Sequence, residues 1–299
     1  MRAAALGAAL AICLLASGAP ASAQGTPPSP AEVARGRYMF GATGGCGCHT
    51  PPKGQPNAGG RRYEGPYGTV YSSNITPDRQ TGIGGWTDQQ IITAIRLGRR
   101  PNGERLLPVH PYPVFNGMAE EDVRAIVAFL RTTPPVSNAN QPKKLVPMFE
   151  SVLLPAWLAA FAPRETPPPK PPAGGAPRGE YLVRAVGHCG ECHTPRTLTL
   201  APDSSRFLAG TSKGPEDQAI PNITPDAETG IGQWSIEEIA DYLGSGIKPD
   251  GDVAGGLMAE LIEGTLAGFK DLTKSDRLAI AQFLKTIPPI RNKIGKTVK

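Results

Sequence analysis

The sequence has few charged residues, few aromatic residues and no long uninterrupted hydrophobic segment. Charged residues make up 19% of its 299 residues, which excludes a polyelectrolyte or a coiled coil. Removing Arg2 with the amino-terminal segment leaves 30 basic and 26 acidic residues, an excess too small to indicate a nucleic-acid partner. The apolar run from Ala3 to Ala16 is shorter than the roughly 18–20 residues that span a membrane. We therefore expect no transmembrane segment in the mature chain.

The amino terminus has the pattern of a secretory signal. Met1-Arg2 supplies a positive charge before the apolar run, and Ala21-Ser-Ala23 supplies the small residues of a cleavage site. The pattern predicts export to the periplasm and a mature chain that begins at Gln24. The mature chain then keeps four of the five cysteines: Cys46, Cys48, Cys189 and Cys192.

Proline and glycine are abundant, with 33 Pro and 36 Gly. These residues favour short helices set in long loops. Helices are predicted near 31–40 and 178–186, and at 123–130, where apolar residues follow the spacing i, i+3, i+4, i+7. Capping boxes that open at Thr87 and Ser235 predict two more. No segment alternates as a strand, so we expect an all-α fold.

One module occurs twice in the chain. Asn74-Ile-Thr-Pro-Asp78 recurs 148 positions later as Asn222-Ile-Thr-Pro-Asp226, and each copy is followed by Thr-Gly-Ile-Gly and a tryptophan. Upstream, Cys46-Gly-Cys-His49 corresponds to Cys189-Gly-Glu-Cys-His193. The repeats predict the following organisation: signal peptide 1–23, first domain 24–140, proline-rich interdomain segment 141–177, second domain 178–292 and basic tail 293–299.

The run Cys189-Gly-Glu-Cys192-His193 has the spacing by which a c-type heme is attached. Each helical residue turns by about 100°, so residues i and i+3 lie on one face and both thiols reach the two vinyl groups of one porphyrin. A redox dithiol does not need the adjacent histidine, and a zinc site needs more ligands than remain. We therefore predict a heme c on Cys189 and Cys192, with His193 bound to its iron.

The iron of such a heme usually takes a sixth ligand, commonly Met or His. Aligning the two copies at an offset of 148 places Met258 opposite His110. Met258 lies among small residues that suit a loop crossing the open heme face, and its alternative role is core packing. We predict Met258 as the sixth ligand of the second heme. The repeated loops, with Trp86 and Trp234, are expected to wall the two heme pockets.

The first motif, Cys46-Gly-Cys48-His49, lacks one residue between its cysteines. On a regular helix, residues i and i+2 point about 200° apart, which separates the two thiols. Three interpretations stay open: a distorted backbone keeps both thioethers, Cys48 alone attaches the heme, or the heme is lost. His110 stands where the second copy has Met258, and both are good iron ligands. Loss of the heme would not explain why one ligand type is replaced by another. We therefore predict a heme c here as well, with His49 and His110 on its iron.

At these residues the chain resembles the multiheme cytochrome c family. Within that family it is similar to the cytochrome subunits of membrane-bound alcohol, aldehyde and sugar dehydrogenases of bacteria. The likeness extends from Tyr38 to Pro289, through both motifs and both loops. Those subunits usually carry a third heme domain and a carboxy-terminal membrane contact, and we expect neither here. The resemblance implies two tandem class I cytochrome c-like domains that carry electrons from a dehydrogenase to a cytochrome or oxidase.

The predicted ligands also indicate a direction of electron flow. A Met ligand raises the reduction potential, so electrons should enter at the first heme and leave from the second. Two alternatives remain. A diheme cytochrome c peroxidase needs an acid–base residue near an open iron, and Glu104 is the carboxylate nearest to His110 in the sequence. A monoheme carrier has a degenerate first site. His188, beside Cys189, is expected to form a hydrogen bond with the backbone or with a heme propionate and not to bind iron.

Overall fold

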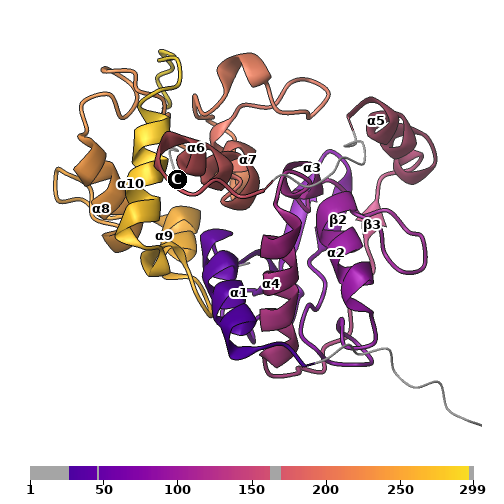
Figure 1. Ribbon diagram of the computed structural model, residues 1–299. Helices are drawn as coiled ribbons and strands as arrows, with labels where there is room; N and C mark the ends of the chain where they lie inside the picture. Colours follow the sequence, from indigo (N-terminus) through magenta and orange to yellow (C-terminus); the bar gives the residue numbers. More distant parts are fainter. Residues whose placement is uncertain (1–26, 46, 162–169, 296–299) are drawn as a thin grey trace, which may run out of the picture.

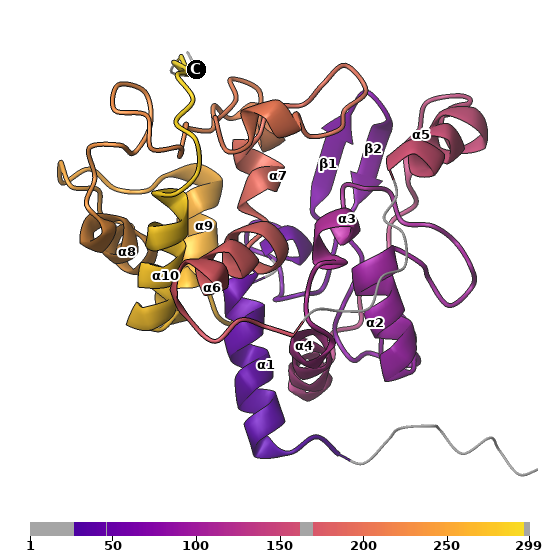
Figure 2. The same ribbon diagram turned by 45° about the horizontal axis from the view of Figure 1, so that its top comes forward.

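The computed structural model describes residues 27–45, 47–161 and 170–295. Helices are the main regular elements of these residues (Figures 1 and 2). The helices are α1 (Pro30–Ala42), α2 (Asp88–Leu97), α3 (Tyr112–Phe115), α4 (Glu120–Thr132), α5 (Leu154–Phe161), α6 (Gly175–Tyr181), α7 (Cys189–His193), α8 (Ile236–Ser245), α9 (Gly256–Glu263) and α10 (Lys274–Leu284). The predicted signal peptide, Cys46, part of the proline tract and the last four residues lie outside the described ranges.

Two helices begin where the capping boxes predict. The Thr87 hydroxyl accepts from the Gln90 N–H at 3.2 Å before α2, and the Gln90 side chain accepts from the Thr87 N–H at 2.8 Å. Ser235 and Glu238 make the same reciprocal pair before α8. Both helices end at a glycine in the left-handed conformation, which satisfies the last carbonyls. The amphipathic helix α4 and the helices α1 and α6 also occupy their predicted positions.

A small antiparallel sheet corrects the all-α prediction. Its strands are β1 (Arg62–Gly65), β2 (Gly68–Tyr71) and β3 (Lys144–Leu145), in the order β1-β2-β3. Val70 is the one strand residue among them that is buried. Because the strands are short and mostly exposed, they carry no apolar alternation, and the sequence pattern gave no sign of them.

The same helix crossing occurs in both halves of the chain. Helix α1 packs on α4, and α6 packs on α10. At each crossing a glycine faces a backbone carbonyl: a Cβ on Gly36 would lie 1.9 Å from the Ala125 oxygen, and one on Gly179 would lie 1.9 Å from the Ala279 oxygen. Glycine is therefore required at both positions for the helices to approach this closely.

One hydrophobic core runs through both halves. It joins Phe40 and Val123 of the first half (residues 27–140) to Val183 and Ala281 of the second half (residues 178–292), all four fully or almost fully buried. The halves lie side by side in Figures 1 and 2, with the second half in orange to yellow. The proline-rich interdomain segment expected from the sequence does not by itself predict that the halves pack this closely.

Helix α5, in the part of the connecting segment that the structure describes, lies at the edge of the molecule in both views. The helical turn η2 (Phe149–Leu153) runs directly into α5. Leu153 and Phe161 are exposed, and the Trp157 indole donates to the Thr199 carbonyl at 2.9 Å. This segment thus docks on a loop of the second half instead of packing between the halves. Across the described ranges, no helix is long and apolar enough to cross a membrane.

Candidate functional site

The intact motif forms the short helix α7, in which Cys189 and Cys192 are one turn apart. Burial raises the pKa of each thiol to about 12, so both are neutral at ordinary pH. The His193 Nδ1 lies 2.8 Å from the Pro221 carbonyl. A carbonyl only accepts, so Nδ1 carries the proton and the lone pair lies on Nε2. Burial lowers the pKa of His193, which keeps this ring neutral and able to bind a metal.

The shortened motif forms a different backbone. Gly47–His49 is a single turn of 3₁₀ helix, not an α-helix. The His49 Nδ1 lies 2.7 Å from the Ser73 carbonyl, and burial lowers the pKa of this ring too. Cys48 is exposed and forms no disulfide with another described cysteine. Cys46 lies outside the described residues, so both-thioether and single-thioether attachment remain open.

The two repeated loops hold the carbonyls that orient these histidines. The residue after Ser73 is Asn74, whose side chain donates to the Thr81 hydroxyl at 3.0 Å and accepts from the Thr76 N–H at 2.9 Å. Asn222, after Pro221, makes the corresponding bonds at the same two distances. Sequence analysis assigned these loops to the pocket walls. Their internal hydrogen bonds give them a further role, which is to fix the carbonyl that each motif histidine contacts.

His110 lies just before α3 and is held differently. Its Nδ1 is buried, with no hydrogen-bond partner among the described residues. The ring stacks on Tyr112, with centroids 6.4 Å apart, and meets the edge of Phe115 at 5.7 Å. Burial lowers the pKa of His110 to about 3, and repulsion from the charged forms of His49 and His188 adds to that effect. His110 and His49, the predicted ligand pair, are therefore neighbours.

Met258 occupies a helix and not the predicted loop. It lies in the first turn of α9, half-buried against the hydrophobic core. Helix α9 begins at Gly256, whose φ is 54°. No polar contact fixes a thioether, so its position alone does not assign it as a ligand.

Arg61 forms hydrogen bonds with residues of both halves, near the two cysteine motifs. Its guanidinium donates to Glu216 at 2.7 Å and to Glu260 at 2.6 Å, both in the second half, and to the Gly47 carbonyl at 3.2 Å in the first motif. Burial alone would lower the pKa of Arg61, but the two carboxylates outweigh it and raise the pKa further. Cys48 in turn lies near enough to Cys192 to raise the pKa of that thiol. The two motifs therefore face each other across the boundary between the halves.

These donors fit c-type hemes. Each motif offers a neutral imidazole whose Nε2 carries the lone pair and whose Nδ1 is held by a carbonyl, which is how metal-binding histidines are commonly oriented. His110 adds a third neutral ring in a dry environment. The described residues contain no cluster of three or more His, Cys, Asp or Glu side chains that would favour a bare metal ion.

Comparison with known proteins decides the family. The chain is 38% identical over 276 residues to a protein of Cereibacter sphaeroides named "Diheme cytochrome c-type", with 87% of each chain covered. The chain belongs to the diheme c-type cytochromes. No protein-family model matches this cytochrome.

Dehydrogenase subunits are also similar to this cytochrome. It is 37% identical over 303 residues to the fructose dehydrogenase cytochrome subunit of Gluconobacter japonicus, covering 95% of the chain and 59% of that subunit. It is 36% identical over 271 residues to an alcohol dehydrogenase (quinone) cytochrome c subunit of Gluconobacter oxydans, covering 87% of the chain and 55% of that subunit. The cytochrome thus spans little more than half the length of these two relatives. The family supports a role in electron transfer.

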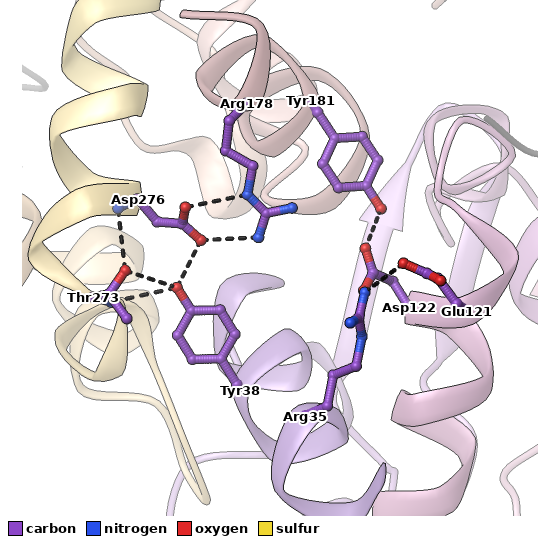
Figure 3. Close-up of polar contacts among 8 residues, drawn as sticks. All are labelled: Arg35, Tyr38, Glu121, Asp122, Arg178, Tyr181, Thr273 and Asp276. Atoms are coloured by element: carbon purple, nitrogen blue, oxygen red, sulfur yellow. Dashed lines mark hydrogen bonds and ion pairs between the residues drawn. The ribbon is translucent and has the colours of Figure 1, made fainter. Parts of the chain in front are cut away.

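Sequence analysis missed the polar contacts that join the halves of the cytochrome (Figure 3). In the first half, Arg35 donates to one oxygen of Asp122, at 2.7 and 3.0 Å. Tyr181 of the second half donates to the other Asp122 oxygen at 2.6 Å and accepts from the Ala119 N–H at 3.1 Å. Asp122 is fully buried, and it is shared between the halves.

The second half repeats this arrangement with the roles exchanged (Figure 3). Arg178 pairs with both oxygens of Asp276, at 2.9 and 3.1 Å, and Tyr38 of the first half donates to the same carboxylate at 2.7 Å. The signal in the sequence is the pattern Arg-Gly-x-Tyr, which occurs at 35–38 and again at 178–181. Each half therefore contributes a tyrosine to the Arg–Asp ion pair of the other.

Proposed function

We propose that this chain is a periplasmic cytochrome that binds two hemes c and passes electrons one at a time from a dehydrogenase-type donor to a respiratory acceptor. The observation that carries the proposal is the matched pair of anchored imidazoles. His49 and His193 each point Nδ1 at the carbonyl that precedes a repeated loop, so each presents Nε2 to a ligand. Metal-binding histidines are commonly oriented in this way, by a carbonyl that accepts from the ring nitrogen away from the metal.

The proposal includes two tandem cytochrome c domains at 24–140 and 178–292, derived from one duplicated module. Three repeated features support the duplication: the hydrogen bonds of the Asn-Ile-Thr-Pro-Asp loops, the glycine at each helix crossing, and the Arg–Asp pair shared with a tyrosine. A module with its own histidine motif, loop and helix pair can hold one heme. Two such modules agree with the word "diheme" in the name of the relative from Cereibacter sphaeroides.

Each module has a proposed set of binding residues. For the first heme we assign Cys48, alone or with Cys46, as thioether and His49 with His110 as iron ligands. For the second we assign the following residues: Cys189 and Cys192 as thioethers, His193 and Met258 as iron ligands. When bound, each heme supplies one-electron oxidation and reduction of iron.

The protein's residues prepare the sites for that chemistry. Ser73 and Pro221 fix the rings of the motif histidines through their carbonyls. Burial keeps His110 neutral, so its lone pair is available at neutral pH without loss of a proton. A Met ligand raises the potential of an iron relative to a second His, and each ~59 mV of difference is a factor of ten for one electron. Electrons should therefore enter at the first site and leave at the second.

Peroxidase activity is less well supported. Glu104, the carboxylate nearest to His110 in the sequence, accepts a hydrogen bond from Lys143 at 2.8 Å. This bond lowers the pKa of Glu104 and keeps its carboxylate charged, which makes it a poor proton donor to peroxide. The names of the dehydrogenase relatives instead support a dehydrogenase as the donor.

The experiment is intact mass spectrometry of the protein secreted to the periplasm, before and after Cys48→Ser and Cys189→Ser substitution. We expect a mature chain from Gln24 that carries the mass of two hemes. Mapping of heme peptides then separates attachment by Cys48 alone from attachment by both cysteines. A single heme on the second motif would refute the two-heme proposal and leave the monoheme alternative. Turnover of peroxide by the half-reduced protein would favour the peroxidase.

A further inference from the structure

His110 differs from the other two predicted histidine ligands in lacking a hydrogen-bonded anchor. His49 and His193 are oriented by carbonyls at 2.7 and 2.8 Å. The Nδ1 of His110 is buried, and none of the described residues accepts from it. A ligand that must present Nε2 in a fixed direction needs some other restraint on its ring. Its aromatic neighbours are the candidates.

The ring contacts of His110 lead across the boundary between the halves. Phe115 meets the His110 ring edge to face, with centroids 5.7 Å apart and an interplanar angle of 71°. The other neighbour of Phe115 is His188, at 5.4 Å and 76°. Such T-shaped pairs have a preferred geometry, so each ring restrains the orientation of the next. His188 belongs to the second half and is the residue immediately before Cys189 in the chain.

His188 is itself held in place. Its backbone has a φ of 41°, in the left-handed region that a non-glycine residue seldom adopts without a structural reason. Burial lowers the pKa of its imidazole, and the charge of Glu191 together with backbone hydrogen bonds, one of them to Thr43 at the end of α1, partly opposes this. The neutral ring is thus fixed between α1 of the first half, Phe115 and its own helix α7. A ring restrained on three sides can restrain its neighbour.

We propose that His188 is a positioning residue for the first heme site: through Phe115, it orients the imidazole of His110 from the other half of the molecule. The proposal rests on the proposed function in one respect, namely that His110 binds the first iron. It makes residue 188, which adjoins the second heme motif, a determinant of the first heme. The first site then depends on correct packing of both halves.

The test compares His188→Ala, Phe115→Leu and His188→Phe in the full-length, heme-loaded protein. The readouts are the electron paramagnetic resonance signal of the oxidised first heme, which reports the relative orientation of two axial imidazole planes, and the midpoint potential of each heme. His188→Ala and Phe115→Leu should change that signal. Each should also shift the midpoint potential of the first heme by at least about 28 mV, which corresponds to a threefold change in the one-electron reduction equilibrium. His188→Phe keeps a ring against Phe115 and should restore both values.

Controls separate this proposal from the ligand assignment. Leu198→Ala alters a fully exposed side chain of the second half and should change neither heme. His110→Ala should convert the first heme to high spin. If it does not, the ligand assignment fails. If it does, but His188→Ala and Phe115→Leu leave the first signal and midpoint unchanged, the positioning role alone is refuted. A change confined to the second heme refutes it equally.

Discussion

Removing one hydroxyl group tests how the halves are held together. Tyr181→Phe keeps the ring and deletes the bond of 2.6 Å to Asp122, together with the acceptor of the Ala119 N–H. The two bonds that Arg35 donates to Asp122 both end on Oδ1, and the Tyr181 hydroxyl donates a hydrogen bond to Oδ2 of this fully buried side chain. A hydrogen bond to a buried charge contributes about 1.5–3 kcal/mol. We expect Tyr181→Phe to reduce the free energy of unfolding by about 2–3 kcal/mol.

Tyr38→Phe is the matched variant at the equivalent position. Here Arg178 donates to both oxygens of Asp276, so each oxygen keeps a donor when the tyrosine hydroxyl is lost. The Asp276 side chain is also 13% exposed, whereas that of Asp122 is 0% exposed. Solvent and Arg178 can therefore compensate in part. The expected loss is about 0.5–1.5 kcal/mol, below that of Tyr181→Phe.

Differential scanning calorimetry of the two heme-loaded variants measures the difference. For a chain of this size, 1 kcal/mol corresponds to a shift of about 2–4 °C, so Tyr181→Phe should lower Tm by about 4–12 °C and Tyr38→Phe by clearly less. Heme spectra recorded before heating confirm that both variants are loaded. Equal shifts, or a larger shift for Tyr38→Phe, would contradict this reasoning. They would show that the energy of the contact does not depend on whether Oδ2 of Asp122, which Arg35 does not bond, keeps a donor.

Three further changes have defined outcomes. Gly36→Ala places a Cβ 1.9 Å from the Ala125 oxygen, so it should force α1 from α4 and cost about 1–3 kcal/mol, seen as a lower denaturant midpoint. Burial by itself raises the pKa of Asp276, but hydrogen bonds outweigh it and the net pKa is lowered. The stabilisation that the ionised Asp276 gives the folded protein is therefore complete above the unfolded pKa of about 4, and it is lost as pH falls through the folded pKa. Asp276→Asn should flatten the dependence of Tm on pH below about 4. Arg61→Gln should lose about 1–2 kcal/mol, discounted because both carboxylates are partly exposed, and should make limited proteolysis between the halves faster.

Local signals in the sequence predict the helices well and the sheet not at all. The boxes at Thr87 and Ser235 define helix starts through bonds between residues three apart, so no tertiary information is needed. The strands pair through backbone groups on an exposed surface, where side chains carry no periodic pattern. The residue missing from the first motif left three interpretations open, one of them a distorted backbone, and the turn at 47–49 is 3₁₀ and not α-helical.

The site is predictable as a set of residues but not as a set of contacts. Cysteine and histidine spacing singled out His49 and His193, yet the carbonyls that orient them are 24 and 28 residues away. The role of Asn74 follows only when its side chain is seen to close the loop. Tyr181 occupies the position in the second copy that Tyr38 occupies in the first. Its partner, Asp122, comes from the other copy, and comparing the copies with each other cannot show a contact between them.

The exchanged tyrosines also bear on how the chain holds its two sites in one position. A proline-rich tether fixes a distance only as well as its own stiffness allows. In this protein a separated first half would leave Asp122 without the Tyr181 hydroxyl, and a separated second half would leave Asp276 without that of Tyr38. A hydrogen bond to a charged group is stronger than one between neutral groups, so these two bonds oppose separation of the halves independently of the tether. Electron transfer between two fixed sites requires such a constraint, and a pair of independent domains on a flexible linker would not provide it.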